Sequence, residues 1–230
     1  MNIALLTAAG KSTRMHMDIP KQFIHIAGKP VIIHTMETFQ RHPGIDAILV
    51  VTLDIWKGTI EAYAKEYGIS KLKWIVQGGD SGQESIRNGL FELEKHCSPD
   101  DVVMIHDGNR PFVSSEIISD SLATYREYGS AVAAIPCIEA IFRSEDGIGS
   151  LDSIPREELF RTQTPHTYSL RKLLWAHEQA EERDIQNTTA TCTLMNALGE
   201  KIYFSKGSEK NLKLTTQDDL DIFKAMLSNI

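Results

Sequence analysis

The chain of 230 residues carries a formal net charge of −7 at pH 7, and 42% of its residues are hydrophobic. This length favours one domain over residues 1–230, and the acidic balance argues against nucleic acid as a partner. No apolar stretch approaches the ~20 residues that span a bilayer, and no signal peptide precedes the first predicted strand, so we expect no membrane contact and a cytoplasmic location.

Apolar strands and amphipathic helices alternate along the chain, which predicts an α/β fold with a mostly parallel, twisted sheet and helices on both faces. The predicted strands cover residues 3–7, 47–53, 73–76, 102–106, 131–136 and 201–205. The predicted helices cover residues 31–41, 56–67, 84–96, 115–129, 170–183, 188–198 and 218–227, the last with Thr216 as its N-cap.

The loop after the first strand combines small residues with positive charge. Ala8, Ala9 and Gly10 have little or no side chain, so backbone N–H groups can approach a phosphate closely. Arg14 and Lys21 add a planar fork and a point charge, and both suit a polyphosphate. The combination is typical of the triphosphate loop of a nucleotidyltransferase.

Other phosphate loops fit this segment poorly. The G-x-x-x-x-G-K-[ST] spacing of a Walker loop is absent. Ser12 and Thr13 follow Gly10, which breaks the G-x-G-x-x-G pattern and disfavours a Rossmann oxidoreductase. The remaining alternative is a tight strand-to-helix turn with two solvated cations.

Two more polar groups follow later strands. The glycine-rich loop at residues 78–82 comes after the strand at 73–76, and Asp107 comes directly after the strand at 102–106. In open α/β sheets, ligands bind at the carboxyl ends of the strands. We therefore expect both groups to lie at the same rim as the first loop.

The alternation of strands and helices stops at about residues 137–161. This stretch contains Gly147, Gly149, many polar residues and only short apolar runs. It predicts an excursion from the sheet, in the form of a protruding β-hairpin arm.

Short motifs continue along nearly the whole chain, and their order and spacing are more specific than any one of them. They are Ala8-Ala9-Gly10, Arg14-Met15, Pro20-Lys21-Gln22-Phe23, Gly28, Pro30-Val31, His34-Thr35, Gly78-Gly79, Glu84-Ser85-Ile86-Arg87-Asn88-Gly89-Leu90, His106-Asp107, Arg110-Pro111, Gln163-Thr164-Pro165, Asn211, Lys213, Thr215-Thr216 and Asp218-Asp219-Leu220. Together they resemble the cytidylyltransferases that form CDP-polyols from 2-C-methyl-D-erythritol 4-phosphate or ribitol 5-phosphate. The resemblance implies a Rossmann-like nucleotidyltransferase fold.

The resemblance also implies a reaction, in which an oxygen of a polyol phosphate attacks the α-phosphorus of CTP and pyrophosphate leaves. Such a transfer depends on charge neutralisation and in-line placement. Arg14, Lys21 and Lys213 would be the catalytic cations, and Asp107 would bind Mg²⁺ or another divalent cation. The implied CTP-binding residues are Ala8, Ala9, Gly10, Lys11, Gly79, Asp80, Ser85 and Asp107.

For the acceptor, the resemblance implies Asn109, Arg110 and Thr164, together with Arg156 from the arm of a second subunit. It therefore implies a homodimer with arm exchange. Several acceptor-side positions depart from the family pattern: Ala140 stands where the family has Thr, and Gly108-Asn109 replaces Ala-Ala. We expect CTP use to be retained, with ribitol 5-phosphate slightly favoured over 2-C-methyl-D-erythritol 4-phosphate as acceptor.

Simpler explanations exist for some of these residues. Ser85 could cap the helix after the glycines, Asp107 could be a turn residue and Lys213 a solvated lysine. His34 and His106 are predicted to be structural. For the whole chain, the alternatives are a non-catalytic nucleotide-binding homologue, or a nucleotidyltransferase with another nucleotide or another sugar phosphate acceptor.

Overall fold

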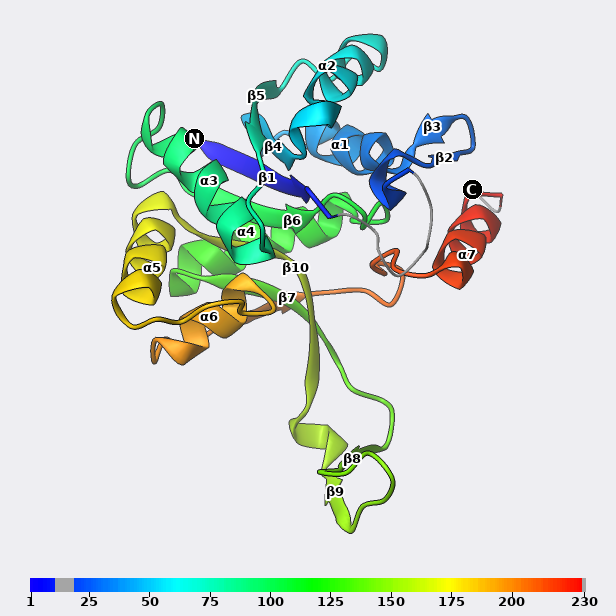
Figure 1. The fold of residues 1–230 in the computed structure, drawn as a ribbon, viewed down its shortest axis with the longest axis vertical. Helices are drawn as coiled ribbons and strands as arrows, with labels where there is room; N and C mark the ends of the chain where they lie inside the picture. Colours follow the sequence, from blue (N-terminus) through cyan, green and yellow to red (C-terminus); the bar gives the residue numbers. More distant parts are fainter. Residues whose placement is uncertain (11–18, 229–230) are drawn as a thin grey trace.

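The computed structural model describes residues 1–10 and 19–228, which fold around a seven-stranded sheet (Figure 1). The strand order is β11-β7-β10-β6-β1-β4-β5, and neighbours are parallel except at β10, which runs antiparallel to β6 and β7. The predicted mostly parallel sheet is thereby confirmed. The strands are β1 (Asn2–Ala8), β4 (Ala47–Thr52), β5 (Leu72–Gln77), β6 (Val102–Asp107), β7 (Ala131–Pro136), β10 (Phe160–Ser169) and β11 (Phe204–Lys206).

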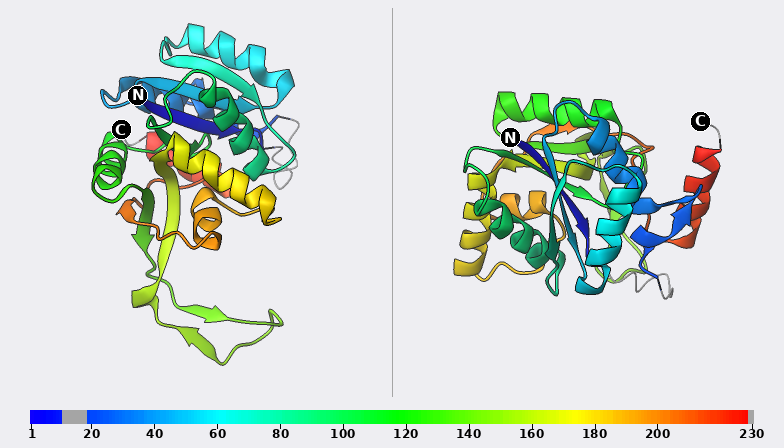
Figure 2. Two further views of the ribbon diagram at one scale, coloured as in Figure 1. Left: turned by 90° about the vertical axis from the view of Figure 1, so that its left-hand side faces the viewer. Right: turned by 90° about the horizontal axis from the view of Figure 1, so that it is seen from above.

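Helices cover both faces of this sheet, as the sequence predicted (Figure 2). Successive side chains of a strand point to opposite faces, so Ala4 and Leu6 of β1 join one core while Ile3 and Leu5 join the other. The first core lies against α1 (Val31–Arg41), α2 (Lys57–Glu66) and α4 (Ser115–Tyr128), and the second against α3 (Gly82–Glu94), α5 (Leu170–Glu182) and α6 (Thr191–Ala197). Within the described residues, no helix combines the length and the apolar character that a membrane crossing needs.

A third, smaller core holds the last helix, α7 (Gln217–Leu227), to the rest of the molecule. Leu220 and Phe223 of this helix are buried with Ile26 of the short hairpin β2 (His25–Ile26) and β3 (Lys29–Pro30). The Thr216 hydroxyl accepts a hydrogen bond from the Asp219 N–H at 3.2 Å, which confirms Thr216 as the N-cap. The segment that joins β11 to α7 is thus anchored at its far end.

The predicted arm projects from the body of the molecule, at the bottom of Figure 1. It leaves the end of β7 and contains the antiparallel pair β8 (Ile141–Arg143) and β9 (Asp152–Ile154), the one-turn helix η4 (Arg156–Glu158) and the return into β10. Apolar side chains near its tip are open to solvent, since Phe142 is 59% exposed and Ile148 is 91% exposed.

Strand β10 is not among the strands predicted from the sequence, although it lies inside the sheet. Its residues at 163–168 are buried, yet most are polar, and Pro165 has no N–H to donate to a neighbouring strand. The pairing of β10 with β7 also shifts register between Thr162 and His166. A search for apolar strands cannot detect such a segment. Smaller differences are the later start of α6, at Thr191, and the position of β11 at Phe204–Lys206.

Candidate active site

The carboxyl ends of β1 and β6 and the loop after β5 meet at a cavity of about 700 Å³. As expected for an open α/β sheet, the polar groups that follow separate strands come together there. The lining includes Ala8, Gly79, Asp107, Thr164 and Lys213. Residues 205 positions apart in the sequence, such as Ala8 and Lys213, therefore share one site.

The first loop is held at its base by a buried glutamine. Gln22, which is only 2% exposed, donates from Nε2 to the carbonyl oxygens of Ala8 at 2.5 Å and Gly10 at 3.2 Å. Lys21 precedes it in the short helix η2 (Lys21–Phe23) and lines the cavity, as do Ala8, Ala9 and Gly10. Two predicted residues of this loop, Lys11 and Arg14, lie outside the described residues.

The glycine loop after β5 packs directly on the first loop. The Gly78 N–H donates to the Thr52 carbonyl at 2.8 Å, and a Cβ placed on Gly78 would lie 2.4 Å from the Cβ of Ala9. This close approach requires glycine at position 78. Gly79, Asp80 and Ser85 follow, and all three line the cavity.

Ser81, not Ser85, caps the helix after these glycines. Ser81 Oγ accepts from the Glu84 N–H at 3.1 Å, and the Glu84 carboxylate accepts in turn from the Ser81 N–H, which forms a capping box. The hydroxyl of Ser85 is buried and accepts from the Gly79 N–H at 3.1 Å. Capping therefore does not explain Ser85, whose contact instead fixes the backbone of the glycine loop.

Asp107 lies at the centre of a cluster of charges. Its carboxylate accepts from Arg110 Nε at 2.9 Å and from Lys213 Nζ at 3.0 Å, and its side chain is 16% exposed. Burial by itself raises the pKa of Asp107, but the two cations outweigh burial and hold that pKa well below its usual range. The carboxylate is thus ionised and partly neutralised by its neighbours.

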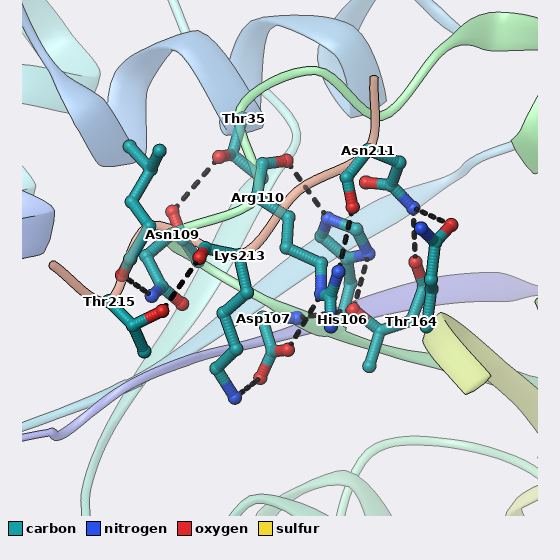
Figure 3. A network of polar contacts seen from close by, with 12 residues as sticks. Thr35, His106, Asp107, Asn109, Arg110, Thr164, Asn211, Lys213 and Thr215 are labelled. Atoms are coloured by element: carbon teal, nitrogen blue, oxygen red, sulfur yellow. Dashed lines mark hydrogen bonds and ion pairs between the residues drawn. The ribbon is translucent and has the colours of Figure 1, made fainter. Parts of the chain in front are cut away.

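His106 fixes the position of Asp107 from inside the fold (Figure 3). Its Nε2 lies 3.2 Å from the Arg110 carbonyl, which can only accept, so the hydrogen-bond network assigns the proton to Nε2. Nδ1 then accepts from the Thr164 hydroxyl at 3.0 Å, and that oxygen accepts from the Asp107 N–H at 3.0 Å. Burial lowers the pKa of His106 to about 3, so the ring is neutral.

The predicted acceptor residues do not all lie in this cavity. Arg110, Thr164 and Asn109 line it, but Asn109 is only 6% exposed. Its amide Nδ2 donates to the Leu214 carbonyl at 2.5 Å. Arg156 lies on the arm and is not among the residues of the cavity; its guanidinium contacts the Ile138 carbonyl and Glu157.

Gln22 and His177 are among the residues of the cavity that had no role predicted from the sequence. Gln22 belongs to the motif Pro20-Lys21-Gln22-Phe23, so this motif could have indicated that Gln22 lies at the site. His177 of α5 belongs to no motif; it is 4% exposed, lines the cavity, and burial lowers its pKa to about 4. Only the packing of α5 against α3 brings it to the site.

The sheet is mostly parallel, and a glycine loop and a cluster of cations meet at the ends of its strands. This is the architecture of a nucleotidyltransferase. The chain belongs to the 2-C-methyl-D-erythritol 4-phosphate cytidylyltransferase family, whose model matches residues 2–229. The family and the relatives below identify its enzyme class as cytidylyltransferase.

Curated relatives match over almost the full chain. A ribitol-5-phosphate cytidylyltransferase of Lacticaseibacillus paracasei is 43% identical, with 99% of this chain and 98% of the relative covered. A 2-C-methyl-D-erythritol 4-phosphate cytidylyltransferase of Clostridium novyi is 37% identical, with 100% of this chain and 97% of the relative covered. The crystal structure of 4-diphosphocytidyl-2C-methyl-D-erythritol synthase from Anaerococcus prevotii has a TM-score of 0.84 at 24% identity and covers 99% of this chain and 96% of its own, which shows the same fold.

Proposed function

We propose that this cytidylyltransferase transfers CMP from CTP to ribitol 5-phosphate. An oxygen of the acceptor phosphate attacks the α-phosphorus, the bond from that phosphorus to the β-phosphate bridging oxygen breaks, and pyrophosphate leaves. The observation that carries the proposal is the meeting of Asp107, Arg110 and Lys213 in the same cavity as the glycine loop. The 43% identical relative named for ribitol 5-phosphate supports this choice of acceptor.

In the proposed complex, the nucleotide occupies the side of the cavity formed by the first loop and the start of α3. Gly79 and Ser85 are fixed to one another by a hydrogen bond, and Asp80 beside them is exposed. A pocket built from backbone groups and short side chains suits a small pyrimidine. Ala8, Ala9 and Gly10 would offer their backbone to the triphosphate.

The proposed catalytic cations are Lys21 and Lys213, together with Arg14, and Lys11 would add a contact to CTP. The side chain of Lys213 is 42% exposed. Its ammonium is therefore not enclosed by apolar groups and can reach a phosphate in the cavity. Cations placed where negative charge develops stabilise the transition state more than the ground state. We therefore assign these residues to turnover rather than to nucleotide affinity.

A divalent cation, Mg²⁺ by preference, is part of the proposal. Within residues 1–10 and 19–228, no cluster of three or more His, Cys, Asp or Glu side chains could hold a metal. Mg²⁺ commonly takes one or two carboxylates and completes its shell with substrate phosphates and water, so Asp107 alone fits. Each oxygen of this carboxylate keeps a lone pair beyond its contact with Arg110 or Lys213. The bound cation would neutralise charge on the phosphates.

Arg110 and Thr164 are the proposed contacts to the acceptor from the same chain, and Asn109 could add only its amide oxygen because its nitrogen is engaged. Arg156 lies outside the cavity of its own chain. We propose that it serves the acceptor phosphate of a second copy, in a homodimer with exchanged arms. The cytoplasmic location expected from the sequence remains a prediction.

A pyrophosphate-release assay tests the proposed reaction. The purified protein is supplied with Mg²⁺, with CTP, UTP or GTP, and with ribitol 5-phosphate or 2-C-methyl-D-erythritol 4-phosphate. We expect release with CTP and ribitol 5-phosphate, and none without an acceptor. A higher kcat/KM with 2-C-methyl-D-erythritol 4-phosphate would identify that compound as the acceptor instead. Absence of pyrophosphate release with both acceptors would support a non-catalytic homologue.

A further inference from the structure

We propose that Asn109 is a positioning residue, which clamps the segment that carries Lys213 and so holds the Lys213 ammonium beside Asp107. The role rests on the proposed function in one respect, because it assumes that Lys213 serves turnover. It differs from the acceptor contact expected from the sequence. The contacts that carry it are drawn together in Figure 3.

Lys213 belongs to a segment that has no regular structure to fix it. Residues 207–216 lie between β11 and α7 and form neither helix nor strand. A lysine on such a segment has a flexible backbone below a side chain with many rotamers, and ordering both is costly. Its ammonium nevertheless lies 3.0 Å from the Asp107 carboxylate. Contacts elsewhere must therefore hold the backbone on either side of Lys213.

Asn109 makes the contact on one side of Lys213. Its Nδ2 donates to the Leu214 carbonyl at 2.5 Å, and its own carbonyl accepts from the Leu214 N–H at 3.0 Å. Both polar groups of the Leu214 backbone are thus bound by one residue. Asn109 is 6% exposed and Leu214 is fully buried, so water does not compete for these bonds.

Arg110 makes the contact on the other side. Its guanidinium Nη1 donates to the Asn211 carbonyl at 2.7 Å while its Nε donates to the Asp107 carboxylate. Asn211, itself fully buried, donates from its side chain to the Thr164 carbonyl at 2.8 Å. The backbone is therefore held two residues before Lys213 and one residue after it.

The loop that carries Asn109 provides a rigid base. The Gly108 N–H donates to the Thr7 carbonyl at 2.9 Å, and the Gly108 carbonyl accepts from the Thr35 hydroxyl at 2.9 Å. A Cβ on Gly108 would lie 2.9 Å from that Thr7 carbonyl, so a larger residue would force the backbone to shift from this close contact. These bonds fix Asn109 relative to β1 and α1. Because Asn109 binds the Leu214 backbone, they also fix the segment next to Lys213.

Removing the Asn109 amide should disturb Lys213 more than it disturbs the fold. In Asn109→Ala the buried Leu214 carbonyl loses its side-chain donor, which favours movement of the segment toward water. In Asn109→Asp, a carboxylate of the same shape has no hydrogen to donate and repels the carbonyl. Asn2→Ala is a matched control, since Asn2 Nδ2 donates to the Gly44 carbonyl at 2.8 Å at the opposite end of β1.

The test combines kinetics with hydrogen exchange of the free protein. We expect Asn109→Ala to lower kcat by roughly tenfold with little change in CTP binding, and to cause no further loss in a Lys213→Ala background. A residue with a general structural role would reduce kcat by the same factor in both backgrounds. Amides at 211–216 should exchange faster in Asn109→Ala and at the wild-type rate in Asn2→Ala.

The exchange measurement keeps this proposal separate from the proposed function. If the wild type turns over none of the acceptors, the proposed function fails while the exchange of residues 211–216 still reports the clamp. Unchanged exchange in Asn109→Ala, or equal effects on kcat with and without Lys213, would overturn the positioning role.

Discussion

At the scale of single residues, Asp107 shows how one carboxylate serves two different cations. Arg110 has a side chain only 12% exposed and also bonds the Asn211 carbonyl, so it is fixed in place. Lys213 is 42% exposed and comes from a separate segment. The buried cation holds the carboxylate, and the exposed one remains available to a phosphate.

Lys21 provides a prediction at this scale. If it acts mainly in the transition state, Lys21→Ala should lower kcat by roughly 100-fold while the Kd for CTP changes little. Pyrophosphate release and titration calorimetry measure the two quantities. Lys95→Ala, which removes an exposed ion pair to Glu92, should alter neither. A loss of affinity as large as the loss of kcat would show that Lys21 binds the ground state equally well.

At the scale of elements, the start of α3 couples local stability to the glycine loop. The capping box of Ser81 and Glu84 satisfies N–H groups at the first turn, and the Glu84 carboxylate also accepts from the Asp80 N–H at 2.7 Å. The same contacts that begin the helix therefore order residues that we propose to bind CTP.

Ser81→Ala should consequently have two effects. It should lower the free energy of unfolding by about 1 kcal/mol through the lost cap, and weaken CTP binding severalfold because the loop loses order. Ser114→Ala is the matched control, since Ser114 caps α4 by accepting from the Ile117 N–H at 3.2 Å, away from the cavity. Urea unfolding and CTP titration of both variants measure the two effects. If Ser114→Ala weakened CTP binding as much as Ser81→Ala, the coupling would be contradicted.

At the scale of the whole molecule, contacts within one chain explain the position of the arm less well than the position of any other part. It leaves the sheet between β7 and β10, exposes Phe142, and carries Arg156 away from the cavity of its own chain. Exposed apolar side chains on a projecting element mark an interaction surface. An isologous dimer would cover the same surface on both copies.

Complementation between two variants tests the exchange of arms. Arg156→Ala and Lys213→Ala should each be poorly active alone. If Arg156 acts in trans, co-folding equal amounts should restore about a quarter of wild-type activity, because half the dimers are mixed and each has one intact site. No recovery in dimers shown to be mixed would place Arg156 outside the partner's site.

Acid stability is a second prediction at this scale, and His177 supplies the reason. Its pKa falls from an ordinary 6.5 to about 4 because the ring is buried, with a smaller effect of Arg87. Between these values the unfolded chain binds a proton that the native state does not. The stabilisation, roughly 3 kcal/mol, is therefore complete above pH 6.5 and is lost as the pH falls toward 4.

Thermal unfolding from pH 7.5 to 4.5 measures this contribution. The Tm of the wild type should fall more steeply over that range than the Tm of His177→Gln, whose amide does not titrate. Parallel curves for the two proteins would show that His177 is not the group responsible.

The sequence by itself determined most strands and helices of the sheet core and the first outline of the site. Runs such as β1 and β4 are apolar enough to be recognised as strands, and Thr216 was identified as a cap because capping is a local interaction. The glycine loop and Asp107 were predicted at the rim because parallel strands end at the same edge. Local patterns and sheet geometry were sufficient for these features.

Only the tertiary structure decided how these parts act on one another. β10 is a polar strand that is recognisable only by its two neighbours, and Ser85 proved to hold Gly79 rather than cap a helix. The contact of Asn109 with Leu214 joins residues 105 positions apart. Such pairings depend on where the chain brings distant backbone groups after the cores have packed, which no local sequence pattern encodes.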